Sequence, residues 1–315
     1  MGDSVTICEC FARDGLQHES TFLPTDTKLK LLKLFADAGF SRIEATSYAR
    51  PSVVPAFADA SDLLRQLPRS AGIRYKATCP NVRAVERAVV DLEAGFGVDE
   101  LSLLVSASES HSQRNLRASR EHQWANIEEM ARYAEGRFTL IGVVSTAFGC
   151  PFEGWVDPDV VMGDVEHFAA LGVTLITLGD TVGQADPRST ESLVSRVLSL
   201  HPAVQLVAHF HNSRGTALAN AVAAYHAGCR NFDTAMGGVG GHPAAIRYGA
   251  GDTGNACTED LVGLFESMGV RTFIDKAKLM TASRACELAL GRRLQSYVAR
   301  ETDGSTEGQP KGGPN

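Results

Sequence analysis

The 315-residue sequence lacks several features that mark specialised classes of protein. It has no long run of Lys and Arg, and its formal net charge is −7, which argues against a nucleic-acid partner or a polybasic contact with a membrane. No apolar stretch reaches the roughly 18 residues that a membrane-spanning helix needs. The first residues, Met-Gly-Asp-Ser-Val, do not follow the basic and then apolar order of a signal peptide. We therefore expect a cytoplasmic protein that acts on a small molecule.

The cysteines also lack the pattern of a disulfide framework. Seven are present, an odd number, widely scattered and without a CxxC pair. We expect them to be reduced thiols. Cysteines in a predicted strand or in an apolar context are usually small buried hydrophobes. On this ground no chemistry is assigned to Cys8, Cys10, Cys229 and Cys286.

Short apolar runs alternate with longer segments of helical period, which is the pattern of βα units around a parallel sheet. The predicted strands are Val5–Cys10, Arg42–Ala45, Arg74–Thr78, Glu100–Val105, Thr139–Ser145, Leu175–Gly179, Val204–His209 and Asn231–Thr234. The predicted helices lie at 25–38, 54–67, 81–94, 119–135, 158–171, 187–200, 216–227 and 258–268. Equal numbers of alternating strands and helices predict an α/β fold, the (β/α)8 TIM barrel.

The end of the chain carries two further features. An apolar segment, Ile274–Leu290, predicts an additional C-terminal helix outside the barrel, so residues 1–290 are expected to form the catalytic domain. Glu301–Asn315 is rich in Gly, Pro and Thr and has almost no apolar residues. We therefore expect residues 291–315 to be a disordered tail.

Polar residues follow nearly every predicted strand, at the end of a parallel barrel where active sites lie. They are, in chain order, Arg13, Asp14, Gln17, Glu44, Cys150, Asp180, His209, His211, His242 and Asn255. Singly, these residues have ordinary explanations. An adjacent Arg and Asp is more often a surface ion pair, and an acidic residue after a strand is often a helix N-cap. Their shared position at one rim favours a functional site.

The strongest single feature is His209-Phe210-His211. Residues two apart on a strand point to the same face, so both imidazoles can reach one ion, although an HxH pair taken alone is more often a chance occurrence. A carboxylate from Asp14 and an amide oxygen from Asn255 would complete a mixed nitrogen and oxygen site with positions open to substrate. Such a site suits Mg²⁺ or Mn²⁺ better than a closed tetrahedral zinc site.

The collinear motifs RDGLQ, IEATSY, GCPFEG, GDTVG, HFHNSRG and TGNACTEDL, with SASESHSQRN at 106–115, resemble the 3-hydroxy-3-methylglutaryl-CoA lyase family over about residues 5–290. This family lies within the metal-dependent TIM-barrel lyases and Claisen synthases. The resemblance implies a divalent-metal-dependent lyase that cleaves a 3-hydroxyacyl-CoA to acetyl-CoA and a 3-oxo acid by a retro-Claisen reaction. It also implies an acyl-CoA substrate and a homodimer or higher homo-oligomer.

The resemblance assigns a role to each rim residue. Asp14, His209, His211 and Asn255 would hold the ion, and Arg13 would stabilise the enolate oxygen of the departing thioester. Glu44 and Asp180 would carry or orient the proton of the substrate hydroxyl. The residues expected to bind substrate are Gln17, Ser47 and Cys150.

The sequence departs from the family where Gly-Gly-Cys-Pro is usual, because it has His242 in place of the cysteine that protonates the enolate. A histidine, with a pKa near 6.5, is a competent proton donor. The following segment, Ala244–Gly254, also looks longer than usual. Three alternatives therefore stay open. They are a lyase for a different acyl-CoA, a condensing acyltransferase of the isopropylmalate or homocitrate synthase type, and a non-catalytic protein that binds acyl-CoA or metal.

Overall fold

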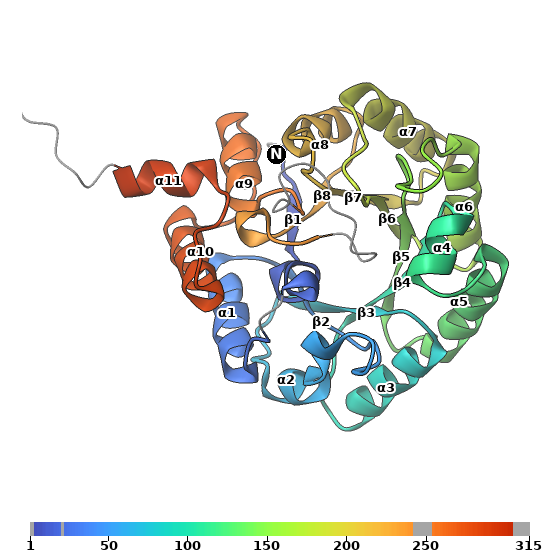
Figure 1. Cartoon of the computed structure of the whole chain (residues 1–315), viewed down its shortest axis with the longest axis horizontal. Coiled ribbons are helices and arrows are strands. Elements are labelled where there is room, and N and C mark those ends of the chain that lie inside the picture. The colour runs from blue at the N-terminus through green and yellow to red at the C-terminus, as the bar shows by residue number, and fades with distance from the viewer. Residues whose placement is uncertain (1–2, 20–21, 242–253, 305–315) are drawn as a thin grey trace, which may run out of the picture.

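Eight parallel strands close into a barrel in the computed structural model, which describes residues 3–19, 22–241 and 254–304, with side chains up to residue 300 (Figure 1). Neighbours in the barrel are neighbours in sequence, from β1 to β8. The strands are β1 (Thr6–Glu9), β2 (Arg42–Ser47), β3 (Arg74–Cys79), β4 (Glu100–Ser106), β5 (Thr139–Ser145), β6 (Leu175–Asp180), β7 (Gln205–Phe210) and β8 (Asn231–Thr234). Each coincides with a predicted strand to within two residues, and the predicted TIM-barrel fold is confirmed.

Helices surround the barrel (Figure 1). They are α1 (Thr25–Ala38), α2 (Ala60–Gln66), α3 (Val82–Glu93), α4 (Glu109–Asn115), α5 (Arg120–Ala134), α6 (Pro158–Ala170), α7 (Pro187–Leu200), α8 (Ala217–His226), α9 (Thr258–Ser267) and α10 (Lys276–Leu290). The helix predicted at 54–67 is divided into a 3₁₀ turn at Pro55–Phe57 and α2. The additional C-terminal helix is α10, as predicted.

Helix α4 is absent from the sequence prediction. All seven of its residues are polar, so they show no helical period of apolar residues. It begins because the Ser108 hydroxyl accepts a hydrogen bond from the backbone N–H of His111 at 3.1 Å. The buried His111 ring then contacts the Ser106 hydroxyl through Nδ1 at 2.9 Å. These contacts hold the helix at the end of β4.

The expectation of disorder is wrong for part of the C-terminal tail, because residues Tyr297–Gly304 form helix α11. Asp260 of α9 holds its beginning: Oδ1 accepts hydrogen bonds from the Ser296 hydroxyl at 3.0 Å and from the Val298 N–H at 2.9 Å. The absent side chain of Gly263 leaves room for Val298 against α9. Composition could not reveal these contacts. Residues 305–315 lie outside the described residues.

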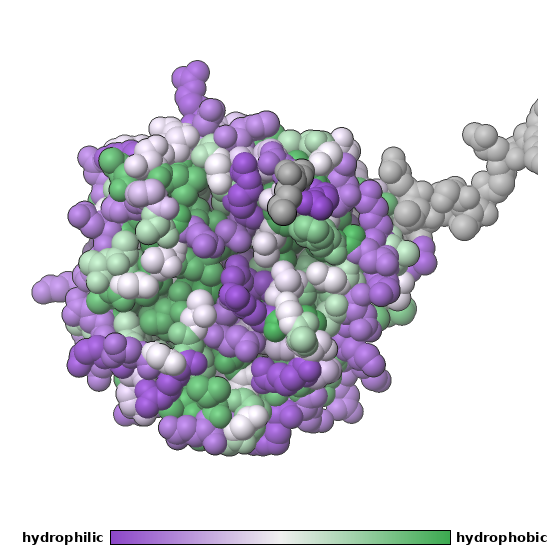
Figure 2. Space-filling model, turned by 180° about the vertical axis from the view of Figure 1, so that it is seen from behind, coloured by the Kyte–Doolittle hydropathy of each residue, from purple (hydrophilic) through white to green (hydrophobic). Residues whose placement is uncertain are grey.

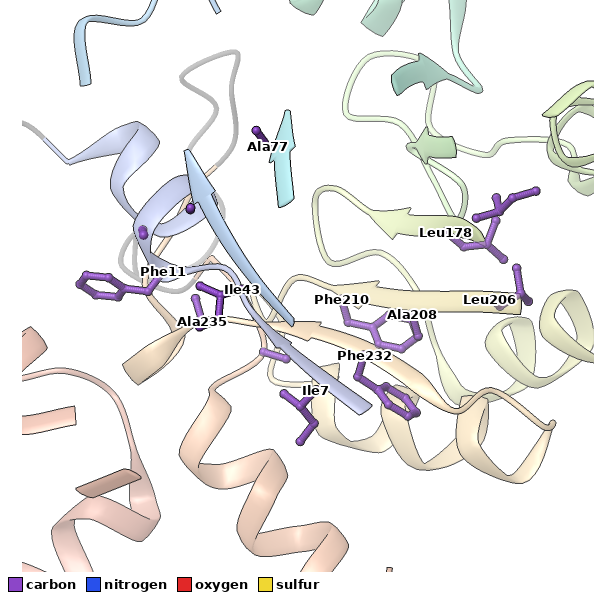
Figure 3. Packing of buried hydrophobic residues seen from close by; sticks show 14 of the residues in the cluster. Ile7, Phe11, Ile43, Ala77, Leu178, Leu206, Ala208, Phe210, Phe232 and Ala235 are labelled. Atoms are coloured by element: carbon purple, nitrogen blue, oxygen red, sulfur yellow. The ribbon is translucent and has the colours of Figure 1, made fainter. Parts of the chain in front are cut away.

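The main core lies between the strands and the surrounding helices. Figure 3 shows part of it around Ile7, Phe210 and Phe232, whose side chains are almost fully buried. Phe232 packs on Phe265 of α9 with ring centroids 5.0 Å apart. Because side chains alternate along a strand, the burial of Phe210 in this core directs His209 and His211 to the other face, toward the barrel mouth.

The outer surface is of mixed polarity. Hydrophilic residues are spread over the face shown in Figure 2, with apolar areas between them. Among the residues that the structure describes, no helix is both long and apolar enough to span a membrane.

Candidate active site

A cavity of about 380 Å³ lies within the barrel at the carboxyl ends of the strands. Its lining includes interior side chains of β3 to β8 and loop residues that follow the strands. The predicted site residues that line it are Arg13, Asp14, Gln17, Ser47, His209 and His211. The structure therefore brings together at one mouth the residues that the sequence placed after strands one, two and seven.

Arg13 and Asp14 lie in a single π-helical turn, Phe11–Gly15, directly after β1. The turn is anchored to the core because Phe11 is fully buried and packs edge-to-face on Phe35 of α1, with ring centroids 6.1 Å apart. Glu9 at the end of β1 accepts the backbone N–H of Phe11 at 2.9 Å. The local fold thus presents the two polar side chains to the cavity.

Asp14, His209 and His211 form a compact group of possible metal ligands. The two Nε2 atoms lie 3.2 Å apart, and Asp14 Oδ2 lies 3.9 Å from Nε2 of His209 and 3.8 Å from Nε2 of His211. A circle through three atoms with these separations has a radius of about 2.1 Å, close to the distance at which Mg²⁺ binds its ligands. The spacing therefore fits a small divalent cation.

Asn255 contributes a fourth side chain. Its nitrogen Nδ2 donates hydrogen bonds to Asp14 Oδ2 at 2.8 Å and to the Val239 carbonyl at 3.0 Å, and these two acceptors determine which end of the amide faces them. The amide oxygen is buried and has no hydrogen-bond partner among the described residues. A buried oxygen without a donor is unfavourable unless a cation or a ligand satisfies it. The donor set thus matches the mixed site that the sequence predicted.

Charge within the site keeps Asp14 ionised. Burial raises the pKa of Asp14, but the positive charge of Arg13 and the imidazoles of His209 and His211 outweigh burial and hold the pKa well below its usual range. Arg13 contacts Asp14 Oδ1 through Nη1 at 2.7 Å. An ionised carboxylate is the form that binds a cation.

Arg13 is fixed from two sides. Its Nε lies 2.8 Å from Glu44 Oε1 of β2, which also accepts the Thr78 hydroxyl at 2.8 Å. Burial lowers the pKa of Arg13, but the charges of Glu44 and Asp14 raise it more, so the guanidinium stays charged. Glu44 is fully buried behind Arg13 and is not among the described residues that line the cavity.

Two charged residues that the sequence analysis missed lie on the Nδ1 side of the His209 ring. Asp233 Oδ2 of β8 lies 3.4 Å from His209 Nδ1, and Lys76 Nζ of β3 lies 3.2 Å from the same oxygen. A carboxylate on Nδ1 orients the ring so that Nε2 faces Asp14. The available signal was a charged residue within a predicted parallel strand, because such strands are otherwise nearly all apolar.

Asp233 also belongs to a second group of close atoms, with Cys8 and Cys10. Burial raises the pKa of the Cys10 thiol well above its usual value, which disfavours the thiolate that a metal would need. The ammonium of Lys76 already lies 4.0 Å from Cys10 Sγ. These features favour the Asp14 group as the metal site.

Asp180 and Cys150 hold loops instead of lining the cavity in the described part of the chain. The fully buried Asp180 carboxylate accepts the backbone N–H groups of Gln184 at 2.7 Å and Ala185 at 3.1 Å, and burial raises the pKa of Asp180 to about 6. The Cys150 thiol donates to the Ser108 hydroxyl at 2.9 Å. Their predicted contacts with substrate have no support from these positions.

His242 lies outside the described residues, so its predicted role stays a prediction. Its neighbour Gly241 lines the cavity. The chain is described again from Gly254, which donates its N–H to the Gly238 carbonyl at 3.1 Å. Gly241 and Gly254, the described residues on either side of His242 in sequence, therefore both lie beside the site.

Comparison with known proteins identifies the family. The HMGL-like family model matches residues 4–286. The chain belongs to the HMGL-like family. Relatives of this HMGL-like protein include hydroxymethylglutaryl-CoA lyase YngG of Bacillus subtilis, 37% identical over 93% of this chain and 95% of the relative. The mitochondrial hydroxymethylglutaryl-CoA lyase of Homo sapiens is 34% identical over 95% of this chain and 89% of the relative.

Solved structures of HMGL-like proteins agree with this assignment. An HMG-CoA lyase from Acinetobacter baumannii, in complex with coenzyme A and 3-methylmalate, superposes with a TM-score of 0.89 at 39% identity and covers 98% of both chains. The carboxyl transferase domain of Rhizobium etli pyruvate carboxylase shares the fold alone, with a TM-score of 0.69 at 16% identity. The family resemblance predicted from the motifs is confirmed.

Proposed function

We propose that this HMGL-like protein is a divalent-metal-dependent carbon–carbon lyase. It cleaves 3-hydroxy-3-methylglutaryl-CoA, or a closely related 3-hydroxyacyl-CoA, to acetyl-CoA and a 3-oxo acid. The observation that carries the proposal is the Asp14, His209 and His211 cluster beside Arg13 at the cavity mouth, in a chain whose relatives are named hydroxymethylglutaryl-CoA lyases.

The proposed metal ligands are Asp14, His209, His211 and the side-chain oxygen of Asn255, with Mg²⁺ or Mn²⁺ as the ion. When bound, the ion supplies Lewis-acid polarisation of substrate oxygens. The chain's own contribution is a ligand set that is oriented beforehand, because Asp233 holds His209 and Asn255 holds Asp14.

Arg13 is proposed to stabilise the charge that develops when the substrate splits. After the substrate hydroxyl gives its proton to solvent water, the bond between C2 and C3 breaks and its electron pair passes to the thioester enolate. A guanidinium fixed by Asp14 and Glu44 at the cavity wall supplies donors to that oxygen without reorganisation. A proton added at C2, for which we propose His242 as donor, completes acetyl-CoA.

Glu44 and Asp180 are proposed to act by orienting the site. Glu44 holds Arg13, and Asp180 holds the loop that contains the cavity-lining Thr181. Gln17 and Ser47, which line the cavity, remain the proposed contacts with substrate. The complex of the Acinetobacter baumannii relative with coenzyme A supports an acyl-CoA substrate for this chain.

Two further proposals rest on the family resemblance and on the scattered cysteines without a disulfide pattern, respectively. They are a homodimer or higher homo-oligomer and a cytoplasmic location. Light scattering on the purified protein during size-exclusion chromatography tests the first, and fractionation of the cells that produce the protein tests the second.

The reaction is tested on protein stripped with EDTA and reloaded with Mg²⁺ or Mn²⁺. Incubation with 3-hydroxy-3-methylglutaryl-CoA should release acetyl-CoA and acetoacetate in equal amounts, and only when metal is present. Condensation of acetyl-CoA with a 2-oxo acid, without cleavage of any 3-hydroxyacyl-CoA, would instead make the protein a Claisen synthase. Binding without turnover would make it a binding protein.

A further inference from the structure

Four polar side chains from the even-numbered strands form one layer across the barrel interior. They are Glu44 of β2, Ser102 of β4, Thr177 of β6 and Asp233 of β8, and all are at least 96% buried. Interior side chains of a TIM barrel stack in layers of four from alternate strands. Residue pairing across two neighbouring strands leads from each member to the position two residues before the next member. Four such steps cross all eight strands and return to Glu44. This set, called the polar layer below, is therefore a single layer.

The polar layer lies directly against the candidate metal site. Asp233 contacts His209 through Oδ2, and Ser102, Thr177 and Asp233 line the cavity. Thr78, which also lines the cavity, donates its hydroxyl to Glu44. A substituent that points from the site into the barrel therefore meets this layer.

Each member of the polar layer has one buried oxygen without a hydrogen-bond partner in the described part of the chain. These atoms are Glu44 Oε2, Ser102 Oγ, Thr177 Oγ1 and Asp233 Oδ1. Glu44 Oε2 has the Lys76 ammonium 3.9 Å away, whereas the other three have no such partner among the described residues. Leaving polar atoms unpaired destabilises a protein, so three in one layer indicate that something else satisfies them. These three side chains, Ser102, Thr177 and Asp233, line the cavity, which makes a bound ligand the natural partner.

The chemistry of the layer restricts the group that fits. The two carboxylate oxygens only accept hydrogen bonds, whereas the two hydroxyls both donate and accept. The ammonium of Lys76, 3.2 Å from Asp233 Oδ2, and the guanidinium of Arg13, 2.8 Å from Glu44 Oε1, balance the two negative charges. The layer therefore offers no uncompensated positive charge to a further anion, and a methyl group would leave the oxygens of Ser102, Thr177 and Asp233 unpaired. A neutral hydroxyl can donate to a carboxylate and accept from Ser102 or Thr177.

We propose that the polar layer selects a 3-hydroxyacyl-CoA whose substituent at C3 carries a hydroxyl group over one whose substituent is methyl. This inference rests on the proposed lyase function and names its substrate class. The bond changes are those already described, so the products are acetyl-CoA and a hydroxylated 3-oxo acid. The hydroxyl of the substituent takes no part in the cleavage and only provides binding energy.

The test compares 3-hydroxy-3-methylglutaryl-CoA with its analogue that has hydroxymethyl in place of methyl. The metal-loaded enzyme should show a kcat/KM at least about tenfold higher for the hydroxymethyl compound, since sites built around a hydroxyl reject analogues that lack it. In Ser102→Val and Thr177→Val the ratio of the two kcat/KM values should fall about tenfold or more. A wild-type ratio at or below one would overturn the inference.

Thr190→Val is the matched control. Thr190 of α7 also has a buried hydroxyl without a partner among the described residues, but it does not line the cavity. The ratio should stay at the wild-type value in this variant. An equal fall in all three variants would mean that hydroxyl removal acts through the fold, and the inference would fail. If neither cavity variant folds, the wild-type ratio decides.

Binding separates this inference from the lyase proposal. Titration calorimetry on the EDTA-treated full-length protein measures the affinity for both compounds without turnover. Tighter binding of the hydroxymethyl compound without cleavage of either one, once metal is restored, would support the selection and reject the lyase. Cleavage of both with equal affinity and equal kcat/KM would support the lyase and reject the selection, because ordered water would then fill the layer.

Discussion

Asn255 donates a hydrogen bond to Asp14 Oδ2 at 2.8 Å and so joins the loops that follow the last and the first strand, 241 residues apart in sequence. Arg13 holds the other oxygen of the same carboxylate at 2.7 Å. With both oxygens held, Asp14 faces His209 and His211 without further rearrangement. The proposed metal site is thus prepared by contacts between side chains before any ion binds.

Removal of one imidazole should abolish tight metal binding. His209→Ala is expected to weaken Mn²⁺ binding by more than the roughly 10- to 100-fold that loss of an outer-shell partner costs. Titration calorimetry and elemental analysis should give one ion per wild-type chain. His167→Ala is the control, because His167 lies at the surface and pairs with Glu128 at 3.1 Å. Wild-type affinity in His209→Ala would reject the ligand assignment.

Replacement of Arg13 by Lys should preserve the fold and remove most turnover. A lysine keeps one charge but lacks the planar fork that contacts Asp14 and Glu44 together. We expect kcat to fall about 10²- to 10³-fold, the range for loss of one oxyanion donor. Steady-state kinetics measure the fall, and circular dichroism confirms the fold. Near-normal activity would reduce Arg13 to a residue that only pairs with its neighbours.

His242→Ala should lower kcat about 10²- to 10⁴-fold with a smaller change in KM, as expected for loss of a general acid. His242→Cys should restore part of the turnover and make it sensitive to thiol oxidation, whereas the wild type should be insensitive. A raised KM with unchanged kcat would assign His242 to substrate recognition. Unchanged values of both would end the proposal.

The buried Glu9 should make folding stability fall with rising pH. Burial raises the pKa of Glu9 to about 8 from 4.5. The folded state therefore binds the Glu9 proton more tightly than the unfolded state, and this stabilising contribution is complete below pH 4.5 and is lost as the pH rises through about 8.

Glu9→Gln should remove that part of the pH dependence. The Gln oxygen can accept the N–H groups of Phe11 and Met236, and its nitrogen can donate to the Thr258 hydroxyl, which then turns to Thr234. The difference in Tm between variant and wild type should grow in favour of the variant from pH 5 to pH 9. A constant difference over that range would show that Glu9 does not titrate there.

The barrel was predictable from sequence because each βα unit carries its own signal. A run of apolar residues flanked by a helical period indicates strand and helix from local spacing alone. Helices α4 and α11 carried no such signal. Helix α4 depends on the Ser108 cap and on the contact of the buried His111 ring with Ser106. Helix α11 depends on Asp260 of another helix. Contacts of this kind join segments that local spacing does not relate.

The candidate metal ligands were also predictable, because residues after parallel strands converge at one rim whatever the details of packing. The same argument placed Asp180 and Cys150 at the rim but could not show that their side chains turn to backbone N–H groups and to Ser108. It also missed Lys76 and Asp233, which lie within strands.

The polar layer could not be predicted from the sequence. Its members are separated by up to 189 positions, from Glu44 to Asp233, and only the offset between neighbouring strands brings them to one height in the barrel. Local spacing determines which residues form strands and which face the interior, because both depend on periods of a few residues. Which interior residues meet depends on the tilt and register of the closed sheet, and these arise only when all eight strands pair.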